Sequence, residues 1–137
     1  RYDLKWKKIL EINSKIYAFD SWIRNSIVWF DIVTDIEKLL ELVVLNHLLS
    51  SWYDVKVWNL GEKEIDFIAK KWTEKKYFQV TYLITSENVY NREFGNLKQI
   101  KDNFEKIVLS MDDIDFKDDS GIKYFKIWEL ENILELK

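Results

Sequence analysis

The chain has 137 residues, of which 47% are hydrophobic and 33% charged, a balance typical of a globular domain and unlike that of a disordered chain. No apolar run approaches the roughly 18 residues needed to span a bilayer, so we expect no membrane partner. The absence of cysteine excludes disulfides and cysteine-ligated zinc and fits a cytoplasmic location. With a net charge of −3, any contact with DNA depends on local basic patches.

The N-terminal region, residues 1–33, carries too little apolar surface for an independent domain. Residues 2–19 read as short strands joined by polar turns, and Asp20–Trp29 reads as a short helix. The chain opens with Arg1 instead of Met and has no signal peptide, so we interpret it as a piece of a longer protein. We expect residues 1–33 to be the trailing part of a preceding domain.

Residues 34–137 alternate between helical and strand patterns. Apolar spacings of three and four predict a long helix over Asp35–Ser50, with Thr34 or Asp35 as its N-cap. The segments that follow predict an α/β fold with a mixed central sheet flanked by helices. In chain order they are strands at Tyr53–Trp58, Glu64–Ala69 and Lys76–Leu83, a helix at Ser86–Ile100, strands at Lys106–Ser110 and Lys123–Ile127, and a helix at Glu129–Leu136.

Polar residues interrupt three of these apolar elements. Glu41 lies inside the apolar part of the long helix, Asp66 alternates with Ile65 and Phe67, and Gln79 and Thr81 are two residues apart on the next strand. We predict that Glu41, Asp66 and Gln79 converge in one small acidic pocket. The alternatives are a surface hydrogen bond for Glu41, outward-facing polarity for Asp66, and a structural hydrogen bond for Gln79.

Six sequence blocks follow one another in a recognisable order along nearly the whole chain: Asp35–Glu41, Gly61–Phe67, Tyr77–Tyr82, Arg92–Leu97, Ile100–Asn103 and Val108–Asp113. Together they resemble the C-terminal domain of unknown function that follows the motor domain in many prokaryotic AAA-type ATPases. The resemblance implies a restriction-endonuclease-like fold, of the PD-(D/E)XK type, and an N-terminal ATPase partner domain. It also implies a winged-helix segment between the two, whose trailing hairpin would be residues 2–19.

The resemblance also implies roles for the polar residues. Nucleases of this fold bind Mg²⁺ with two acids and a backbone carbonyl, and a lysine stabilises charge near the attacking water. Here Glu41, Asp66, Gln79 and Thr81 stand at these positions. Gln79 brings a neutral oxygen where an acid is usual, and Thr81 replaces the lysine. We therefore expect a degenerate catalytic site that still offers Glu41, Asp66 and Gln79 to Mg²⁺.

These observations leave three functions open. The first is an accessory module of the ATPase that contacts DNA or protein, and the second is an active Mg²⁺-dependent nuclease. The third is a structural or oligomerisation domain. No phosphate-binding Gly-Lys-Ser/Thr loop is present, so this piece should not hydrolyse ATP. A basic cluster at a turn contacts phosphate or simply adds solubility; it consists of Lys70, Lys71, Lys75 and Lys76.

Tryptophan usage is unusual, with seven Trp, three Gly and no Pro. Trp52, for example, lies two residues after the end of the predicted long helix, where glycine commonly adopts the left-handed conformation. We hypothesise that a reassigned UGA codon, read as glycine in the cell, has been translated as tryptophan. These indoles should then be more exposed than that of Trp128; the alternative is drift to tryptophan-rich turns. The tryptophans at glycine-like positions are Trp6, Trp22, Trp29, Trp52, Trp58 and Trp72.

Overall fold

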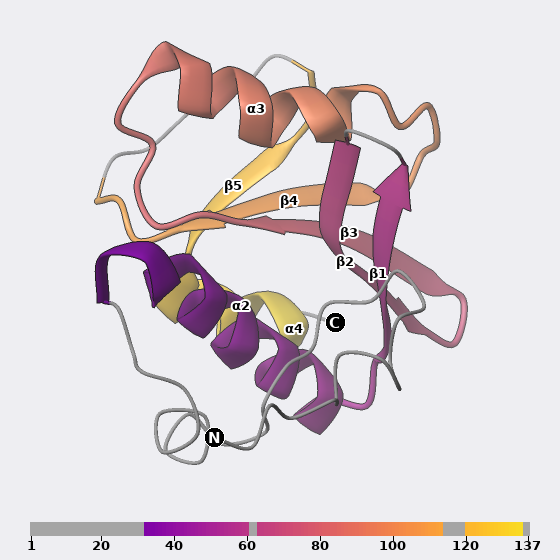
Figure 1. The fold of residues 1–137 in the computed structure, drawn as a ribbon. Coiled ribbons are helices and arrows are strands. Elements are labelled where there is room, and N and C mark those ends of the chain that lie inside the picture. Colours follow the sequence, from indigo (N-terminus) through magenta and orange to yellow (C-terminus); the bar gives the residue numbers. More distant parts are fainter. Residues whose placement is uncertain (1–31, 61–62, 114–119, 136–137) are drawn as a thin grey trace, which may run out of the picture.

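A computed structural model describes residues 32–60, 63–113 and 120–135. Figure 1 shows a central sheet with helices on both sides of it. Its elements follow the predicted order, and their ends differ from the predicted ones by a few residues. They are α2 (Ile32–Ser50), β1 (Asp54–Leu60), β2 (Lys63–Lys71), β3 (Glu74–Val80), α3 (Glu87–Lys98), β4 (Glu105–Ser110), β5 (Lys123–Lys126), the 3₁₀ helix η2 (Ile127–Glu129) and α4 (Leu130–Glu135). The predicted hairpin and the helix Asp20–Trp29 lie outside the described residues.

The five strands form one mixed sheet in the order β1-β2-β3-β4-β5. β1, β2 and β3 pair antiparallel, whereas β4 pairs parallel with both β3 and β5. A parallel pair needs a crossover connection, and α3 supplies it between β3 and β4. The predicted mixed sheet flanked by helices is thus confirmed.

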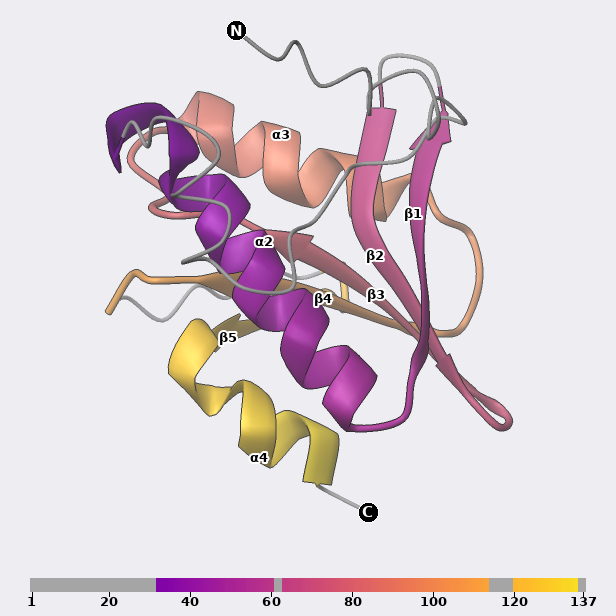
Figure 2. The same cartoon turned by 60° about the horizontal axis from the view of Figure 1, so that its bottom comes forward.

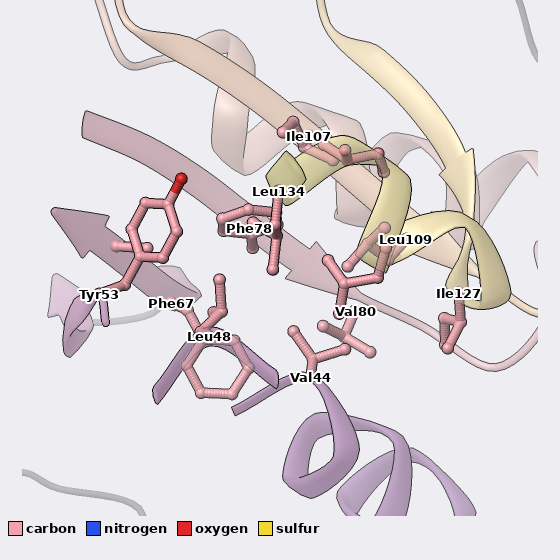
Figure 3. Close-up of a cluster of buried hydrophobic side chains, with 13 residues drawn as sticks. Val44, Leu48, Tyr53, Phe67, Phe78, Val80, Ile107, Leu109, Ile127 and Leu134 are labelled. Atoms are coloured by element: carbon pink, nitrogen blue, oxygen red, sulfur yellow. The ribbon is translucent and has the colours of Figure 1, made fainter. Parts of the chain in front are cut away.

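Each face of the sheet has its own hydrophobic core. Along β4, Ile107 and Leu109 join one buried cluster, and Val108 between them joins the other. The first cluster packs against α2 and α4, which lie side by side in Figure 2; Figure 3 shows its side chains. The second packs against α3 through Phe94 and Leu97. The alternation of strand residues therefore places α3 on one face and α2 with α4 on the other.

The two long helices begin differently from each other. Helix α3 begins after Ser86, whose side chain accepts a hydrogen bond from the backbone N–H of Val89 over 3.3 Å, a standard N-cap. The predicted N-cap of α2 at Thr34 or Asp35 is wrong, because that helix already begins at Ile32. In the sequence, the apolar pair Ile32-Val33 lies four and three residues before Ile36 and so continues the helical spacing upstream. The helix therefore begins before Thr34.

A β-bulge in β2 changes the direction of its side chains. Lys56 of β1 pairs with Ile68, and Trp58 pairs with Ile65, so one residue of β1 faces two residues of β2. Ile65 packs in the core on the α3 side, whereas Phe67 packs on the α2 side. The predicted strict alternation around Asp66 is therefore wrong, because the extra residue turns the strand between Ile65 and Phe67.

Two tryptophans have backbone angles that favour glycine. Trp52 has a φ of 65° and Trp72 a φ of 57°, and their side chains are 85% and 94% exposed. Both exceed Trp128 at 56%, as the glycine hypothesis predicts, but Trp58 at 37% does not. For Trp58 the exposure expectation is wrong, because its side chain lies on the sheet at the bulge. Trp6, Trp22 and Trp29 lie outside the described residues.

Within the described ranges, no helix is both long enough and apolar enough to cross a bilayer.

Candidate functional site

The site lies where β2 and β3 separate. Their antiparallel pairing ends at Phe67 and Phe78, although both strands continue beyond these residues. Figure 1 shows β2 turning away from β3 towards α3. The backbone N–H of Val80, which would otherwise pair with β2, donates instead to Oδ2 of Asp66 over 2.8 Å. The Asp66 carboxylate thus takes the place of a strand partner at the point of separation.

A pocket of about 270 Å³ opens at this separation. Four elements contribute to it, two helices from opposite faces of the sheet and two strands between them. Helix α3 is fixed there by a hydrogen bond from the Asn96 amide to the Glu64 carbonyl oxygen over 3.1 Å. The lining residues are Glu37 and Glu41 of α2, Glu64 and Asp66 of β2, Gln79 and Val80 of β3, and Arg92, Glu93 and Asn96 of α3.

The three residues predicted to converge line this one pocket. Glu41, Asp66 and Gln79 are 9%, 3% and 7% exposed, so all three polar side chains are buried. Gln79 shares a side-chain hydrogen bond with Glu93, which it donates to the carboxylate. Its other polar atom, Oε1, is buried and accepts no hydrogen bond within the described part of the chain. A buried amide oxygen without a donor is costly, and a bound cation or water would satisfy it.

Helix α3 adds an ion pair that the sequence reasoning missed. Nε and Nη2 of Arg92 both contact Oε1 of Glu93, at 2.7 and 2.6 Å. Burial raises the pKa of Glu93, and the nearby Asp66 raises it further, while Arg92 and Gln79 act against this rise. The signal in the sequence was an acid on the apolar side of the helix, four residues before Leu97.

Thr81 lies beside the pocket without lining it. Its side chain is fully buried, and its hydroxyl donates to Oε1 of Glu37 over 3.4 Å. The Thr81 backbone N–H donates to the carbonyl oxygen of Leu109, which holds the end of β3 against β4. No cation therefore reaches the pocket from this position, which directly follows β3.

The basic cluster lies at the β2–β3 turn, at the other end of these strands. Lys75 lies 3.6 Å from Asp102, and Lys76 lies 2.8 Å from Glu105. Contacts from Lys123 and Lys76 hold the pKa of Glu105 below its usual value. Lys71 lies 5.3 Å from the centre of the Tyr53 ring. Lys70 is exposed, so the four lysines do not form one uniform surface.

The donor set of the pocket suits a hard divalent cation in its chemistry. Carboxylate and amide oxygens are the ligands that Mg²⁺ prefers. Oε1 of Gln79, which accepts no hydrogen bond from the described residues, lines the same pocket as Asp66 and Glu41 and fits the role of a metal ligand. Among the described residues, however, no three acidic, histidine or cysteine side chains are already arranged to hold a metal ion. A cation would therefore have to draw the carboxylates together.

The chain is similar to an uncharacterized protein of Haemophilus influenzae (strain ATCC 51907 / DSM 11121 / KW20 / Rd). The two are 37% identical over 110 residues, which cover 80% of this chain and 26% of that protein. The chain thus spans about a quarter of the length of this curated relative. No family model matches the chain, and no solved structure matches it.

Proposed function

We propose that the pocket binds a divalent cation such as Mg²⁺ and, with it, a phosphate of nucleic acid, with little or no cleavage. The observation that carries this proposal is the meeting of Glu41, Asp66 and Gln79 in one pocket, with a buried Gln79 oxygen that accepts no hydrogen bond from the described residues. In this proposal the domain has a degenerate restriction-endonuclease-like core. It acts as a nucleic-acid-contacting module.

Two features argue against efficient cleavage. Gln79 supplies a neutral oxygen, so a bound cation meets one negative charge fewer than with an acid there. Thr81 donates to Glu37 and supplies no positive charge. Removing one well-placed electrostatic group typically costs roughly 10²–10³ in rate, and two are changed here.

The larger context is part of the same proposal. The resemblance to the C-terminal domains of AAA-type ATPases suggests that a motor domain precedes this module in a cytoplasmic protein. The Haemophilus relative is consistent with this, because most of its length lies outside the matched region. ATP-driven movement of the motor would then change the position of the pocket on nucleic acid.

An active nuclease is the second candidate, and one observation favours it. The pocket keeps two buried acids, Glu41 and Asp66, and adds the buried Glu93 from α3. Glu93 would bring a third carboxyl group to the pocket beside the neutral Gln79.

One set of assays tests both candidates. Mn²⁺ titration of the ¹⁵N-labelled 137-residue chain should broaden the NMR signals of Asp66 and Gln79 first. Asp66→Asn, which keeps an oxygen acceptor for the Val80 N–H but removes a carboxylate ligand, should weaken this broadening strongly. Glu131→Gln, an exposed α4 residue that does not line the pocket, serves as the matched control. Equal broadening in Asp66→Asn and the control would overturn the cation site.

Plasmid nicking with Mg²⁺ or Mn²⁺ separates the two candidates. The accessory module predicts no nicking above that of a mock preparation. Nicking that disappears in Asp66→Asn and persists in Glu131→Gln would establish the nuclease instead.

A further inference from the structure

The Arg92 side chain connects the buried pocket with solvent. Its Nε and Nη2 contact one buried oxygen, Oε1 of Glu93. The Glu93 side chain is 4% exposed, whereas that of Arg92 is 60% exposed. The guanidinium is therefore fixed on its inner edge and accessible on the rest of its surface. A planar fork held in this way is pre-organised for a second anion.

The charges around the pocket make Arg92 distinctive. Among the described residues, the pocket lining has five carboxylates and a single cation, which is Arg92. Contact with Glu93 raises the pKa of Arg92, and the charges of Glu37 and Asp66 raise it further, so the positive charge is permanent. Arginine also binds phosphate with better-defined geometry than lysine does.

We propose that Arg92 is the phosphate-binding cation of this pocket. It would supply from α3 the positive charge that Thr81, directly after β3, does not supply. This inference rests on the proposed function and names its ligand, a phosphodiester of nucleic acid. Glu93 is a positioning residue, because it holds the guanidinium at the pocket through two contacts.

Electrostatics makes phosphate binding depend on the divalent cation. A phosphate near Arg92 also approaches the carboxylates of Asp66 and Glu37, which repel it. A bound cation neutralises part of this charge and lets the phosphate reach the guanidinium. Binding through Arg92 should therefore be stronger when the cation is present.

Fluorescence anisotropy with a labelled single-stranded oligonucleotide tests the proposal in the 137-residue chain, with Ca²⁺ as the cation. Arg92→Gln should weaken binding roughly 10- to 100-fold, the range expected for losing a charged hydrogen-bonding partner. Lys98→Gln, on the same helix and outside the pocket lining, is the matched control and should bind as the unchanged chain does. Equal binding by the unchanged chain and Arg92→Gln would overturn the proposal.

A double-mutant cycle tests the positioning role of Glu93. Glu93→Gln should weaken oligonucleotide binding, but it should have no further effect in the Arg92→Gln background. Additive losses in the double variant would show that Glu93 does not act through Arg92. Circular dichroism of each variant checks that the fold is retained.

Comparison of oligonucleotide binding by Arg92→Gln and Asp66→Asn separates this inference from the proposed function. Loss of binding in Arg92→Gln with none in Asp66→Asn supports Arg92 and overturns the cation site. Loss in Asp66→Asn with none in Arg92→Gln does the reverse. Displacement of the oligonucleotide by inorganic phosphate at an equal concentration of phosphate groups, measured with Mg²⁺ because phosphate precipitates Ca²⁺, would identify free phosphate as the ligand and overturn the nucleic-acid assignment.

The backbone at Trp52 and Trp72 carries a second, independent inference. After α2, the N–H of Trp52 donates to the carbonyl oxygen of Leu49, and that of Tyr53 donates to Leu48. These two bonds define a Schellman motif, in which the residue with positive φ is usually glycine. Tyr53 and Leu48 belong to one buried cluster, and a hydrophobic contact between these two positions frequently accompanies the motif.

The turn between β2 and β3 leads to the same conclusion. Lys71 pairs with Glu74, so Trp72 and Thr73 form a two-residue hairpin loop. Of these two residues only Trp72 has a positive φ. This is the pattern of a type II′ turn, whose first central residue is typically glycine.

We infer that positions 52 and 72 carry glycine in the protein made by its own cell, through a UGA codon read as glycine. The gene should show UGA at both positions and UGG at Trp128. Mass spectrometry of the natural protein should find glycine in the tryptic peptide that begins after Lys71. UGG at positions 52 and 72, or tryptophan in that peptide, would overturn the inference.

Discussion

At the scale of single residues, the left-handed conformation of Trp72 has a measurable cost. A side chain with a Cβ loses about 1–2 kcal/mol there, and glycine avoids the clash at some entropic cost in the unfolded chain. Because the Trp72 indole is 94% exposed, its removal loses almost no buried surface. We predict that Trp72→Gly raises the free energy of unfolding in urea by about 1 kcal/mol.

Trp128→Gly is the matched control for this prediction. Trp128 is not at a position that favours glycine. It lies within η2, and the centre of its ring is 5.8 Å from Nζ of Lys126. Glycine there should lower stability, because it removes this contact and weakens the helical turn. The same loss of stability in both variants would contradict a glycine-favouring backbone at Trp72.

The raised pKa of Glu93 predicts that the stability of the fold depends on pH. Burial raises its pKa in the folded chain, so the folded state favours the protonated carboxyl. The resulting stability is fully present below the ordinary carboxyl pKa and is lost as pH rises through the raised pKa. Glu93→Gln should therefore flatten the fall in unfolding free energy from acidic to neutral pH. Urea denaturation from acidic to neutral pH measures this change in unfolding free energy. Glu87→Gln, at an exposed acid of the same helix, is the control.

The residues of the pocket differ in how far sequence could predict them. Asp66 and Gln79 interrupt strands that are otherwise apolar, and a polar residue inside such a strand is conspicuous. Glu93 was missed because it lies in a helix rich in polar residues, next to the exposed Arg92. Only its spacing from Leu97 shows that it lies on the buried side. That spacing is a weak signal, because whether a polar residue on the apolar side of a helix is buried depends on packing against distant segments.

At the scale of elements, periodicity predicted the helices and strands well. The segments around Val44 and Val108 follow the helical and buried-strand patterns closely, and both are core residues. The bulge in β2 was not predictable, because an extra residue leaves the local sequence pattern unchanged. It becomes visible only through the pairing partners Trp58 and Ile65.

The separation of β2 and β3 depends on one carboxylate, which gives a prediction at this scale. Asp66→Ala removes the acceptor of the Val80 N–H and leaves a buried donor unsatisfied. We expect a loss of about 1–3 kcal/mol in unfolding free energy. Asp66→Asn keeps an oxygen at this place and should lose much less. Urea denaturation of both variants compares them, and equal losses would show that the hydrogen bond to Val80 does not hold the strands.

At the scale of the whole molecule, the pocket and the basic turn lie at different places along the same two strands. Asp66 and Lys70 are four residues apart on β2, roughly 13 Å at about 3.3 Å per residue. A few nucleotides span this distance, since each strand of a duplex advances about 3.4 Å per nucleotide along the helix axis. A nucleic acid bound at Arg92 can therefore also pass the exposed Lys70.

The four lysines of the turn should respond differently to charge reversal. Lys76→Glu breaks the contact with Glu105 and should lower stability together with any effect on binding. Lys70→Glu changes an exposed charge and should leave stability nearly unchanged. Lys70 is therefore the residue that separates binding from folding.

We predict that Lys70→Glu weakens oligonucleotide binding and lowers the slope of log affinity against log salt by about one, as expected for the loss of one phosphate contact. Lys98→Glu makes the same charge change on α3, outside both the pocket and the turn, and controls for net charge. Anisotropy titrations over a range of salt concentrations measure the slope. Equal slopes for the two variants would confine the nucleic acid to the pocket, because a strand that extends along β2 must meet Lys70 and need not meet Lys98.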